Sequence, residues 1–428
     1  MKRATLFLAL LALACAGTPA RVETPAGGDV AAPAAARQGT ASVVRVLITP
    51  RARRAVTLAA LGGDWRLYEE GGRALLARGI PGRTWRVEAA GGGRLRAVRD
   101  DGVVTAARPG PFLARPSEDE ALMTLDGRRW RGDLLVVATD TGLLVVNQLG
   151  VEDYLRGVVP LEIGDRPASE RAAAEAQAVA ARSYVYVRAD GDPRRRWDLV
   201  AGVADQVYGG VEAERAVSDA AVRATAGEVL WYGGRAVSAP YSAVCGGSTA
   251  EPPEVWRSGG EPYLRRVSDV NPATGRPWCE PSPRFRWTRS FTGAQLDDAI
   301  ARYLRGRGQR ASAPGRVRGV RVASTTPSGR VGTLEIDAEG GTQALRGNDI
   351  RYALRAASGE ILPSTYFSVE SAVVGRDGRV SSLTLRGTGN GHGVGMCQWG
   401  AIGRARAGHD YRRILQAYFP GTTLRRVE

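Results

Sequence analysis

The sequence predicts an α+β fold: a strand-rich mixed fold with one long alanine-rich core helix and a substrate cleft between subdomains. Three observations predict it. Short apolar runs alternate with glycine-rich turns through the first third of the chain, an alanine-rich segment with helical spacing follows, and strand-like runs return after it. At 428 residues, the chain is long enough to bury a large core and to divide into two or three domains.

The N-terminus has the pattern of an export signal. Lys2 and Arg3 precede the apolar run Leu6–Leu13, which has the length of a signal-peptide core and is too short to span a bilayer. We assign residues 1–16 to a signal peptide. Residues 17–40 are rich in Ala, Pro, Gly and Thr, which predicts a flexible tether.

The cleavage point would decide how the exported protein is anchored. Cleavage after Ala14 would leave Cys15 as the N-terminus, as in a bacterial lipoprotein, whereas an ordinary signal peptidase would cut after Ala16 or Ala20. In both cases we expect an exported protein of the periplasm or cell envelope. It would contact a membrane only through its signal or through a lipid anchor at Cys15.

The net charge of +15 is carried almost wholly by arginine, since Lys2 is the only lysine. Such a surface attracts polyanions. However, no basic segment interleaved with aromatic residues and no nucleic-acid-binding motif is present, so we expect no nucleic-acid partner. We interpret the charge as arginine-rich composition spread over solvated faces.

Residues 41–148 are expected to form an N-terminal β-rich subdomain. Apolar runs with period-two alternation and glycine-rich turns recur from Ser42 to Arg115, and the pattern continues from Arg128 to Gln148. The chain changes character at Val151, where the catalytic region, residues 149–428, is expected to begin.

The helical part of this region follows at once. Apolar residues have helical spacing from Val151 to Val159, and Pro160–Gly164 is expected to be a compact turn. The core helix is predicted over Ser169–Arg188, because its stripe of small residues favours close packing. A shorter helix is predicted over Glu214–Thr225.

The rest of the chain reads as strands with short helices, and residues 284–386 are a candidate inserted subdomain. A hairpin is expected around Gly233-Gly234, and Pro252–Pro283 is loop-rich. The remaining elements are strands at Arg284–Phe291, Val317–Val322, Val331–Ile336, Thr342–Leu345 and Val380–Arg386, and helices at Ala294–Leu304, Asn348–Leu354 (with an Asn cap), Ala401–Arg406 and Tyr411–Tyr418.

The glycine-rich stretch Gly389–Ala401 mixes apolar Val394 and Met396 with polar His392 and Gln398. Glycine allows positive φ and close backbone approach, which suits either a pocket wall or a buried bend. No phosphate-binding loop, G-x-S-x-G elbow or H-E-x-x-H motif is present.

Glu162 is the candidate general acid. It stands between the apolar segment ending at Leu161 and Ile163, directly before the core helix. A carboxyl in apolar surroundings has its charged form disfavoured and its pKa raised, which makes it a usable acid near neutral pH. The alternative is a carboxylate that complements the helix dipole or pairs with an arginine.

Three cysteines would face an oxidising compartment after export: Cys245, Cys279 and Cys397. An odd number allows one disulfide with a leftover thiol, or three metal ligands. Their spacing matches no common zinc pattern, and His392 is the only neighbouring histidine. We therefore favour a Cys245–Cys279 disulfide over metal, although connectivity does not follow from sequence.

Three blocks resemble one family. They are VNQLGVEDYLRGVVPLEI with the helix EAQAVAARSYVYVR; ADQVYGG with ATAGEVLWYGGRAVSAPYSAVCGGSTAEPPEVW; and GNGHGVGMCQWGAIGRARAGHDYRRILQAYFPGTTL. From about Val43 to Leu424, the chain resembles the stage II sporulation protein D / amidase-enhancer (SpoIID/LytB) family. The blocks keep the family's order.

The resemblance implies a peptidoglycan lytic transglycosylase. Such enzymes cleave between N-acetylmuramic acid and N-acetylglucosamine, preferring glycan strands stripped of stem peptides, and leave anhydro-muramic ends. The family's essential glutamate falls on Glu162, as single general acid and base. Asp165 is a nearby carboxylate that this chemistry does not require.

The resemblance also implies substrate-binding positions, since sugars offer hydroxyl and acetamido groups to polar side chains. Tyr184 and Tyr208 could equally be core aromatics, and His392 could equally brace its loop. The implied positions are Arg182, Tyr184, Gln206, Tyr208, Ser242, His392 and Gln398.

No cofactor is expected. Some members bind zinc through Cys and His at a CGGHT-type turn, but this chain has Ser248 where that His would be. Two rival functions stay open: a non-catalytic wall-binding protein that enhances an amidase, and a metal-dependent hydrolase. The expected partners are peptidoglycan glycan strands and other wall hydrolases such as an amidase. Nothing in the sequence points to sporulation itself.

Overall fold

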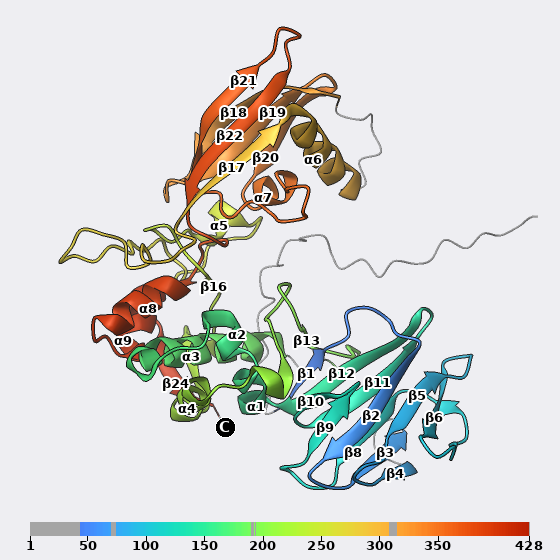
Figure 1. The fold of residues 1–428 in the computed structure, drawn as a ribbon. Helices are drawn as coiled ribbons and strands as arrows, with labels where there is room; N and C mark the ends of the chain where they lie inside the picture. Colours follow the sequence, from blue (N-terminus) through green and yellow to red (C-terminus); the bar gives the residue numbers. More distant parts are fainter. Residues whose placement is uncertain (1–42, 70–73, 190–191, 193, 308–314, 428) are drawn as a thin grey trace, which may run out of the picture.

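The structure, a computed structural model, describes residues 43–69, 74–189, 192, 194–307 and 315–427. The predicted signal peptide, the tether and Cys15 lie outside the described residues. The predicted α+β, strand-rich class is confirmed: a group of helices has one strand-rich part beside it and another above it (Figure 1). Among the described residues, no helix has the length and apolar character needed to cross a membrane.

The N-terminal strands form two sheets that share one hydrophobic core (Figure 1). Alternate residues Val56, Leu58 and Ala60 of β2 (Ala55–Leu61) are buried, as period-two alternation predicts. The seven-stranded sheet has the order β13 (Leu199–Val200), β1 (Val43–Leu47), β12 (Gly142–Gly150), β11 (Asp133–Thr139), β8 (Phe112–Pro116), β3 (Trp65–Glu69) and β4 (Leu75–Gly79). The six-stranded sheet has the order β10 (Arg128–Trp130), β9 (Leu122–Leu125), β2 (Ala55–Leu61), β5 (Trp85–Ala89), β6 (Arg94–Arg99) and β7 (Arg108–Pro109).

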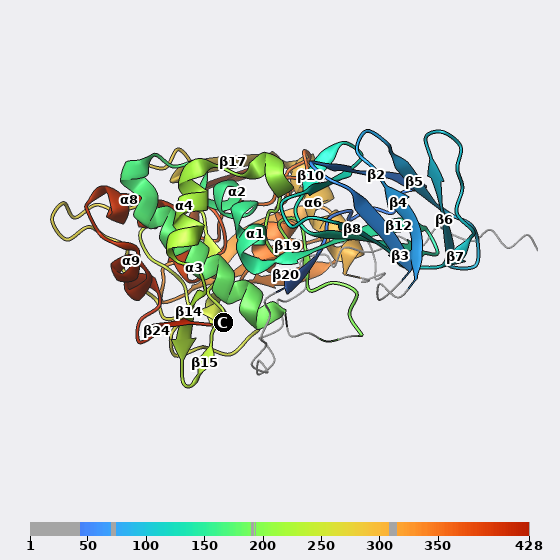
Figure 2. The same cartoon turned by 90° about the horizontal axis from the view of Figure 1, so that it is seen from below.

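The central helix of the molecule is α3 (Arg171–Arg188), the predicted alanine-rich core helix. Its small residues Ala173, Ala176 and Ala180 are fully buried, so neighbouring helices approach closely. Figure 2 shows these helices gathered beside the N-terminal strands. Those around α3 are α1 (Val151–Arg156), α2 (Val159–Ile163), α4 (Ala216–Ala224), α8 (Gln398–Arg406) and α9 (Tyr411–Tyr418).

One local prediction in this region is wrong. The segment Pro160–Gly164 is not a compact turn, because Val159–Ile163 forms the short helix α2. Proline fits the first turn of a helix, where its missing N–H has no intrahelical partner. The helix predicted to run on from Val151 ends earlier, at Arg156, with Gly157 as its C-cap.

Short strands connect the helices to the C-terminus. The predicted hairpin at Gly233-Gly234 joins β14 (Glu228–Tyr232) to β15 (Arg235–Ala236), and β14 also pairs with the last strand, β24 (Thr423–Arg426). Strand β16 (Tyr241–Ser242) pairs in parallel with β23 (Met396–Cys397). The loop-rich segment after it contains one short helix, α5 (Pro252–Val255).

Residues from β17 to β22 form a strand-rich body with its own hydrophobic core (top of Figure 1). Its two three-stranded sheets are β17 (Arg286–Thr292), β22 (Val380–Thr388) and β21 (Phe367–Val374), and β18 (Val317–Thr325), β19 (Val331–Ala338) and β20 (Gly341–Arg346). Its helices are α6 (Gly293–Gly306) and α7 (Asp349–Ala353). Strand β21 was not predicted, and Asn348 precedes α7 without a side-chain cap bond.

Candidate active site

Glu162 is held by a backbone contact from a distant loop. It lies near the end of α2, between exposed Leu161 and buried Ile163. Its Oε1 atom accepts a hydrogen bond from the backbone N–H of Val207 at 2.7 Å. Gly164 then ends the helix with φ 82°, a conformation that glycine adopts at little cost. One oxygen of the half-buried carboxyl is therefore fixed.

The surroundings of Glu162 favour its protonated form. Burial raises the pKa of the Glu162 carboxyl above its ordinary value of 4.5. Hydrogen bonds from the Val207 backbone and from the Gln398 side chain act in the opposite direction, because they stabilise the charged form. The net shift is upward, as the apolar setting in the sequence predicts.

The glycine-rich stretch folds back to Glu162 at Gln398, the first residue of α8. The Gln398 side chain is buried and reaches the Glu162 carboxyl. Its Nε2 donates to Oε1 of Gln177 at 3.2 Å, and Gln177 lies fully buried on the core helix. A polar bridge thus joins the core helix, the glycine-rich stretch and the candidate acid.

Two half-buried tyrosines interact electrostatically with Glu162. Burial raises the pKa of both Tyr184 and Tyr241, and the negative charge of Glu162 contributes to each shift. The Tyr184 hydroxyl donates to Oδ1 of Asp205 at 2.7 Å. Both phenols therefore stay protonated near neutral pH.

Three predicted substrate-binding residues are buried instead. Arg182 is 1% exposed and forms a bidentate ion pair with Glu152, with both contacts at 2.7 Å. Gln206 is 1% exposed and donates to the Tyr241 hydroxyl at 3.0 Å. The Tyr208 hydroxyl donates to Asn147 at 2.8 Å within the core. Their polar groups are bound to partners inside the protein, which corrects the prediction that they contact substrate.

Ser242 and His392 brace the glycine-rich stretch. The buried Ser242 Oγ accepts the backbone N–H of Gly393 at 3.2 Å, and Nδ1 of His392 accepts that of Val394 at 3.1 Å. Burial lowers the pKa of His392 to about 3, so its ring is neutral near pH 7. The ring packs against Trp256, with 5.0 Å between centroids.

Three groups around Glu162 were not predicted from the sequence. Gln177 is a polar residue inside an alanine-rich helical stripe, a signal that could have been used. Tyr241 lies directly before Ser242 in a block that was already singled out. The Val207 N–H could not have been found, because a backbone group leaves no mark in the sequence.

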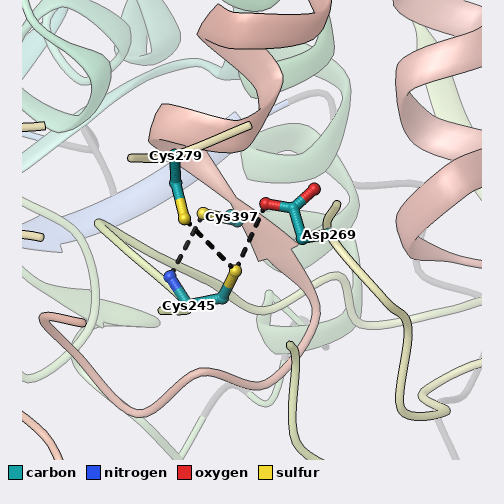
Figure 3. Close-up of side chains that lie close together, drawn as sticks. All are labelled: Cys245, Asp269, Cys279 and Cys397. Atoms are coloured by element: carbon teal, nitrogen blue, oxygen red, sulfur yellow. Dashed lines mark hydrogen bonds between the residues drawn. The ribbon is translucent and has the colours of Figure 1, made fainter. Parts of the chain in front are cut away.

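The predicted Cys245–Cys279 disulfide is not formed. The two sulfur atoms are 3.7 Å apart, whereas a disulfide bond is about 2.05 Å long. Cys397 and Asp269 lie in the same buried cluster, which could hold a metal ion (Figure 3).

Comparisons with known proteins identify two segments. Residues 139–232, which include Glu162, match the family model described as Stage II sporulation protein. Residues 278–395, which include the separate strand-rich body, match a domain of unknown function (DUF8618).

Curated relatives cover more of the chain. It is 30% identical over 302 residues to an uncharacterised protein of Brachyspira hyodysenteriae (strain ATCC 49526 / WA1), covering 70% of this chain and 73% of that protein. It is 30% identical over 296 residues to Stage II sporulation protein D of Bacillus subtilis (strain 168), covering 65% and 75%. It is 30% identical over 304 residues to the Amidase enhancer of the same strain, covering 63% of this chain and 40% of the relative.

Proposed function

This chain belongs to the SpoIID/LytB family, and from that premise we propose that it is a peptidoglycan lytic transglycosylase with Glu162 as its single general acid and base. The names of its relatives, Stage II sporulation protein D and Amidase enhancer, support a role connected with the cell wall. We also propose export to the periplasm or cell envelope, where peptidoglycan lies, because residues 1–16 have the pattern of a signal peptide.

The observation that carries the proposal is the asymmetric setting of the Glu162 carboxyl. Oε1 is fixed by the Val207 N–H, and we assign the transferred proton to Oε2. Burial raises the pKa of this carboxyl and so increases the protonated fraction at working pH. A general acid needs both features: a directed proton and a pKa above the ordinary value.

The reaction can be balanced with this one carboxyl. Glu162 donates its proton to the glycosidic oxygen while the bond from that oxygen to the muramyl anomeric carbon breaks. The resulting carboxylate then takes the proton from the C6 hydroxyl of the same muramyl residue, whose oxygen bonds to the anomeric carbon. Glu162 ends protonated, as it began. No water is consumed, so the second placed carboxyl of a hydrolytic glycosidase is not required.

The neighbouring acids fit this single-carboxyl scheme. Asp205 accepts hydrogen bonds from Tyr184 and the Val200 backbone, and Glu152 is paired with Arg182. Asp165 is exposed on the segment that follows α2. The cleft between subdomains, in which a glycan strand would bind, stays a prediction.

The decisive experiment is mass analysis of denuded glycan strands digested with the exported protein. We expect anhydro-muramyl ends from wild type, and a loss of at least about 100-fold with Glu162→Gln, which keeps the shape of the side chain but cannot donate a proton. Asp165→Asn is the matched control and should retain activity. Equal product profiles for wild type and Glu162→Gln would refute the proposal, and reducing ends without anhydro groups would indicate hydrolysis.

A second candidate is favoured by the match to the Amidase enhancer: a non-catalytic wall-binding protein. On that reading, Glu162→Gln would bind glycan as wild type does, and either protein would raise the turnover of an added amidase. The third candidate, a metal-dependent hydrolase, requires that chelation abolish product release. Since the proposed chemistry uses only a carboxyl, we expect folded protein to keep its activity in chelator.

A further inference from the structure

Three cysteines and one aspartate, far apart in sequence, meet in a buried cluster (Figure 3). Cys245 follows β16, Asp269 and Cys279 belong to the loop-rich segment, and Cys397 ends β23. One ligand atom from each lies within 4.8 Å of all the others, and all four residues are buried. We propose that this thiol cluster binds one zinc ion through three thiolates and the Asp269 carboxylate.

The distances within the thiol cluster match tetrahedral zinc. With Zn–S bonds of about 2.3 Å, tetrahedral geometry separates two sulfur ligands by about 3.7 Å. The sulfur atoms of Cys245 and Cys279 are 3.7 Å apart. Oδ2 of Asp269 is 3.2 Å from the Cys245 sulfur, close to the sulfur–oxygen separation of about 3.5 Å in the same geometry. Both separations therefore fit two edges of a tetrahedral zinc site, and the remaining ligand pairs lie within 4.8 Å.

Backbone N–H groups point at the sulfur atoms. The N–H groups of Cys245 and Gly400 donate to the Cys397 sulfur at 3.2 and 3.3 Å, and that of Gly247 donates to the Cys245 sulfur at 3.4 Å. Cys397 is also the N-cap of α8, where the helix dipole favours negative charge. Such donors stabilise thiolates, the form of cysteine that binds metal.

The outer contacts orient the carboxylate and balance its charge. Oδ1 of Asp269 accepts from the Tyr418 hydroxyl at 2.7 Å and pairs with Arg404 at 3.2 Å, which leaves Oδ2 facing the thiols. Buried Arg330 donates to the Cys245 carbonyl at 2.7 Å. Three thiolates, one carboxylate and Zn²⁺ carry a net charge of −2, and these two guanidinium groups offset it. Such second-layer contacts are typical of protein metal sites.

Zinc fits better than other ions or a disulfide. Thiolates are soft ligands, and a buried, closed set of four suits a structural zinc. A Cys245–Cys279 disulfide would use two of the four groups and leave the Cys397 thiol and the Asp269 carboxyl buried without a metal ion to bind. The site is separate from the acid–base chemistry at Glu162. The bound zinc would hold Cys397 in place. Cys397 directly precedes Gln398, whose side chain reaches Glu162.

The test combines metal analysis with a map of the thiols in the exported protein purified without added metal. We expect about one zinc per chain, and alkylation of Cys245, Cys279 and Cys397 only after denaturation in chelator. Cobalt exchanged into the site should give the intense absorption of tetrahedral cobalt–thiolate. A Cys245–Cys279 disulfide without metal would overturn the proposal, and so would three free thiols in a protein that does not take up zinc.

Variants locate the metal. Cys397→Ser and Asp269→Asn should each weaken zinc binding by at least about tenfold. His409→Ala is the control, because it removes the other histidine of the chain, which packs on Trp278 and lies outside the thiol cluster. Retention of zinc at wild-type affinity by Cys397→Ser would overturn the proposal. If a variant does not fold, the wild-type measurements decide alone.

Discussion

The backbone N–H of Val207 donates a 2.7 Å hydrogen bond to Oε1 of Glu162, although 45 residues separate the two in sequence. This bond commits one oxygen of the carboxyl to the protein, and the Gln398 side chain donates a further hydrogen bond to the carboxyl. It also opposes the rise in pKa that burial produces, so the acid strength of Glu162 is a balance between the two effects. A change at Gln398 should alter the same balance, because its side chain also stabilises the charged form of Glu162.

Gln398→Met should move the pH profile of the reaction upward. Methionine has a similar volume but no N–H, so the charged form of Glu162 loses a stabilising partner and the pKa rises further. Since the first step needs protonated Glu162, the limb of the rate profile that falls as this group ionises should shift to higher pH. The check is the pH dependence of anhydro-product release. Exposed Gln416→Met is the control, and an unchanged or lowered midpoint for Gln398→Met would contradict the assignment.

Glu162→Gln should stabilise the fold at neutral pH while it removes activity. The folded-state pKa of Glu162 is raised, so its contribution to stability is fully present below the unfolded pKa and is lost as pH rises through the folded pKa. Glutamine does not ionise, and its carbonyl can still accept the Val207 N–H. We expect a higher melting temperature for the variant at pH 7, with a difference that vanishes near pH 4, about the ordinary glutamate pKa. A difference that does not depend on pH would contradict this account.

Arg182→Met should lower stability rather than glycan affinity. The guanidinium is 1% exposed and donates to Glu152 and to the backbone carbonyl of Glu228. Losing these charge-assisted bonds should cost about 2–3 kcal/mol. Denaturant unfolding measures that cost, and glycan pull-down with folded protein should match wild type. Weakened glycan binding without any loss of stability would contradict this account and support direct contact between Arg182 and the substrate.

The sequence predicted Glu162 because its neighbours are apolar, and burial does raise its pKa in the structure. It did not distinguish exposed polar residues from buried ones with partners. Arg182 and Gln206 looked like groove residues, yet their partners, Glu152 and Tyr241, lie 30 and 35 residues away. The spacing of residues in the sequence describes one helix or strand at a time. Contacts such as Arg182–Glu152 and Gln206–Tyr241 form only when different elements pack together.

Features of the fold around the site were likewise predictable only where they depend on one continuous segment. The long core helix was predictable because alanine periodicity is local to one segment. The cysteine cluster was not, because its members span Cys245 to Cys397 and include Asp269, which no cysteine pattern reveals. Strand β21 pairs with β22 but was not predicted, because six of its eight residues are exposed and its alternation of buried and exposed positions is weak.

Gly395→Ala tests how the glycine-rich stretch supports the site. Gly395 has φ 73°, and a Cβ there would lie 2.0 Å from the carbonyl oxygen of Pro240, which accepts the Met396 N–H. Gly378 has the same φ of 73° but open space around its Cβ position. Both alanine variants bear the backbone cost of about 1–2 kcal/mol, and only Gly395→Ala adds a clash of about 1–3 kcal/mol.

Since the clash would displace β23 from β16, it should also shift Gln398, three residues further on, away from Glu162. We therefore expect Gly395→Ala to lose more stability than Gly378→Ala and to release anhydro product more slowly, while Gly378→Ala keeps wild-type activity. Denaturant unfolding and single-time-point product analysis measure both effects. Equal losses in the two variants would show that backbone strain alone sets the cost, and that the tight packing against Pro240 does not support the active site.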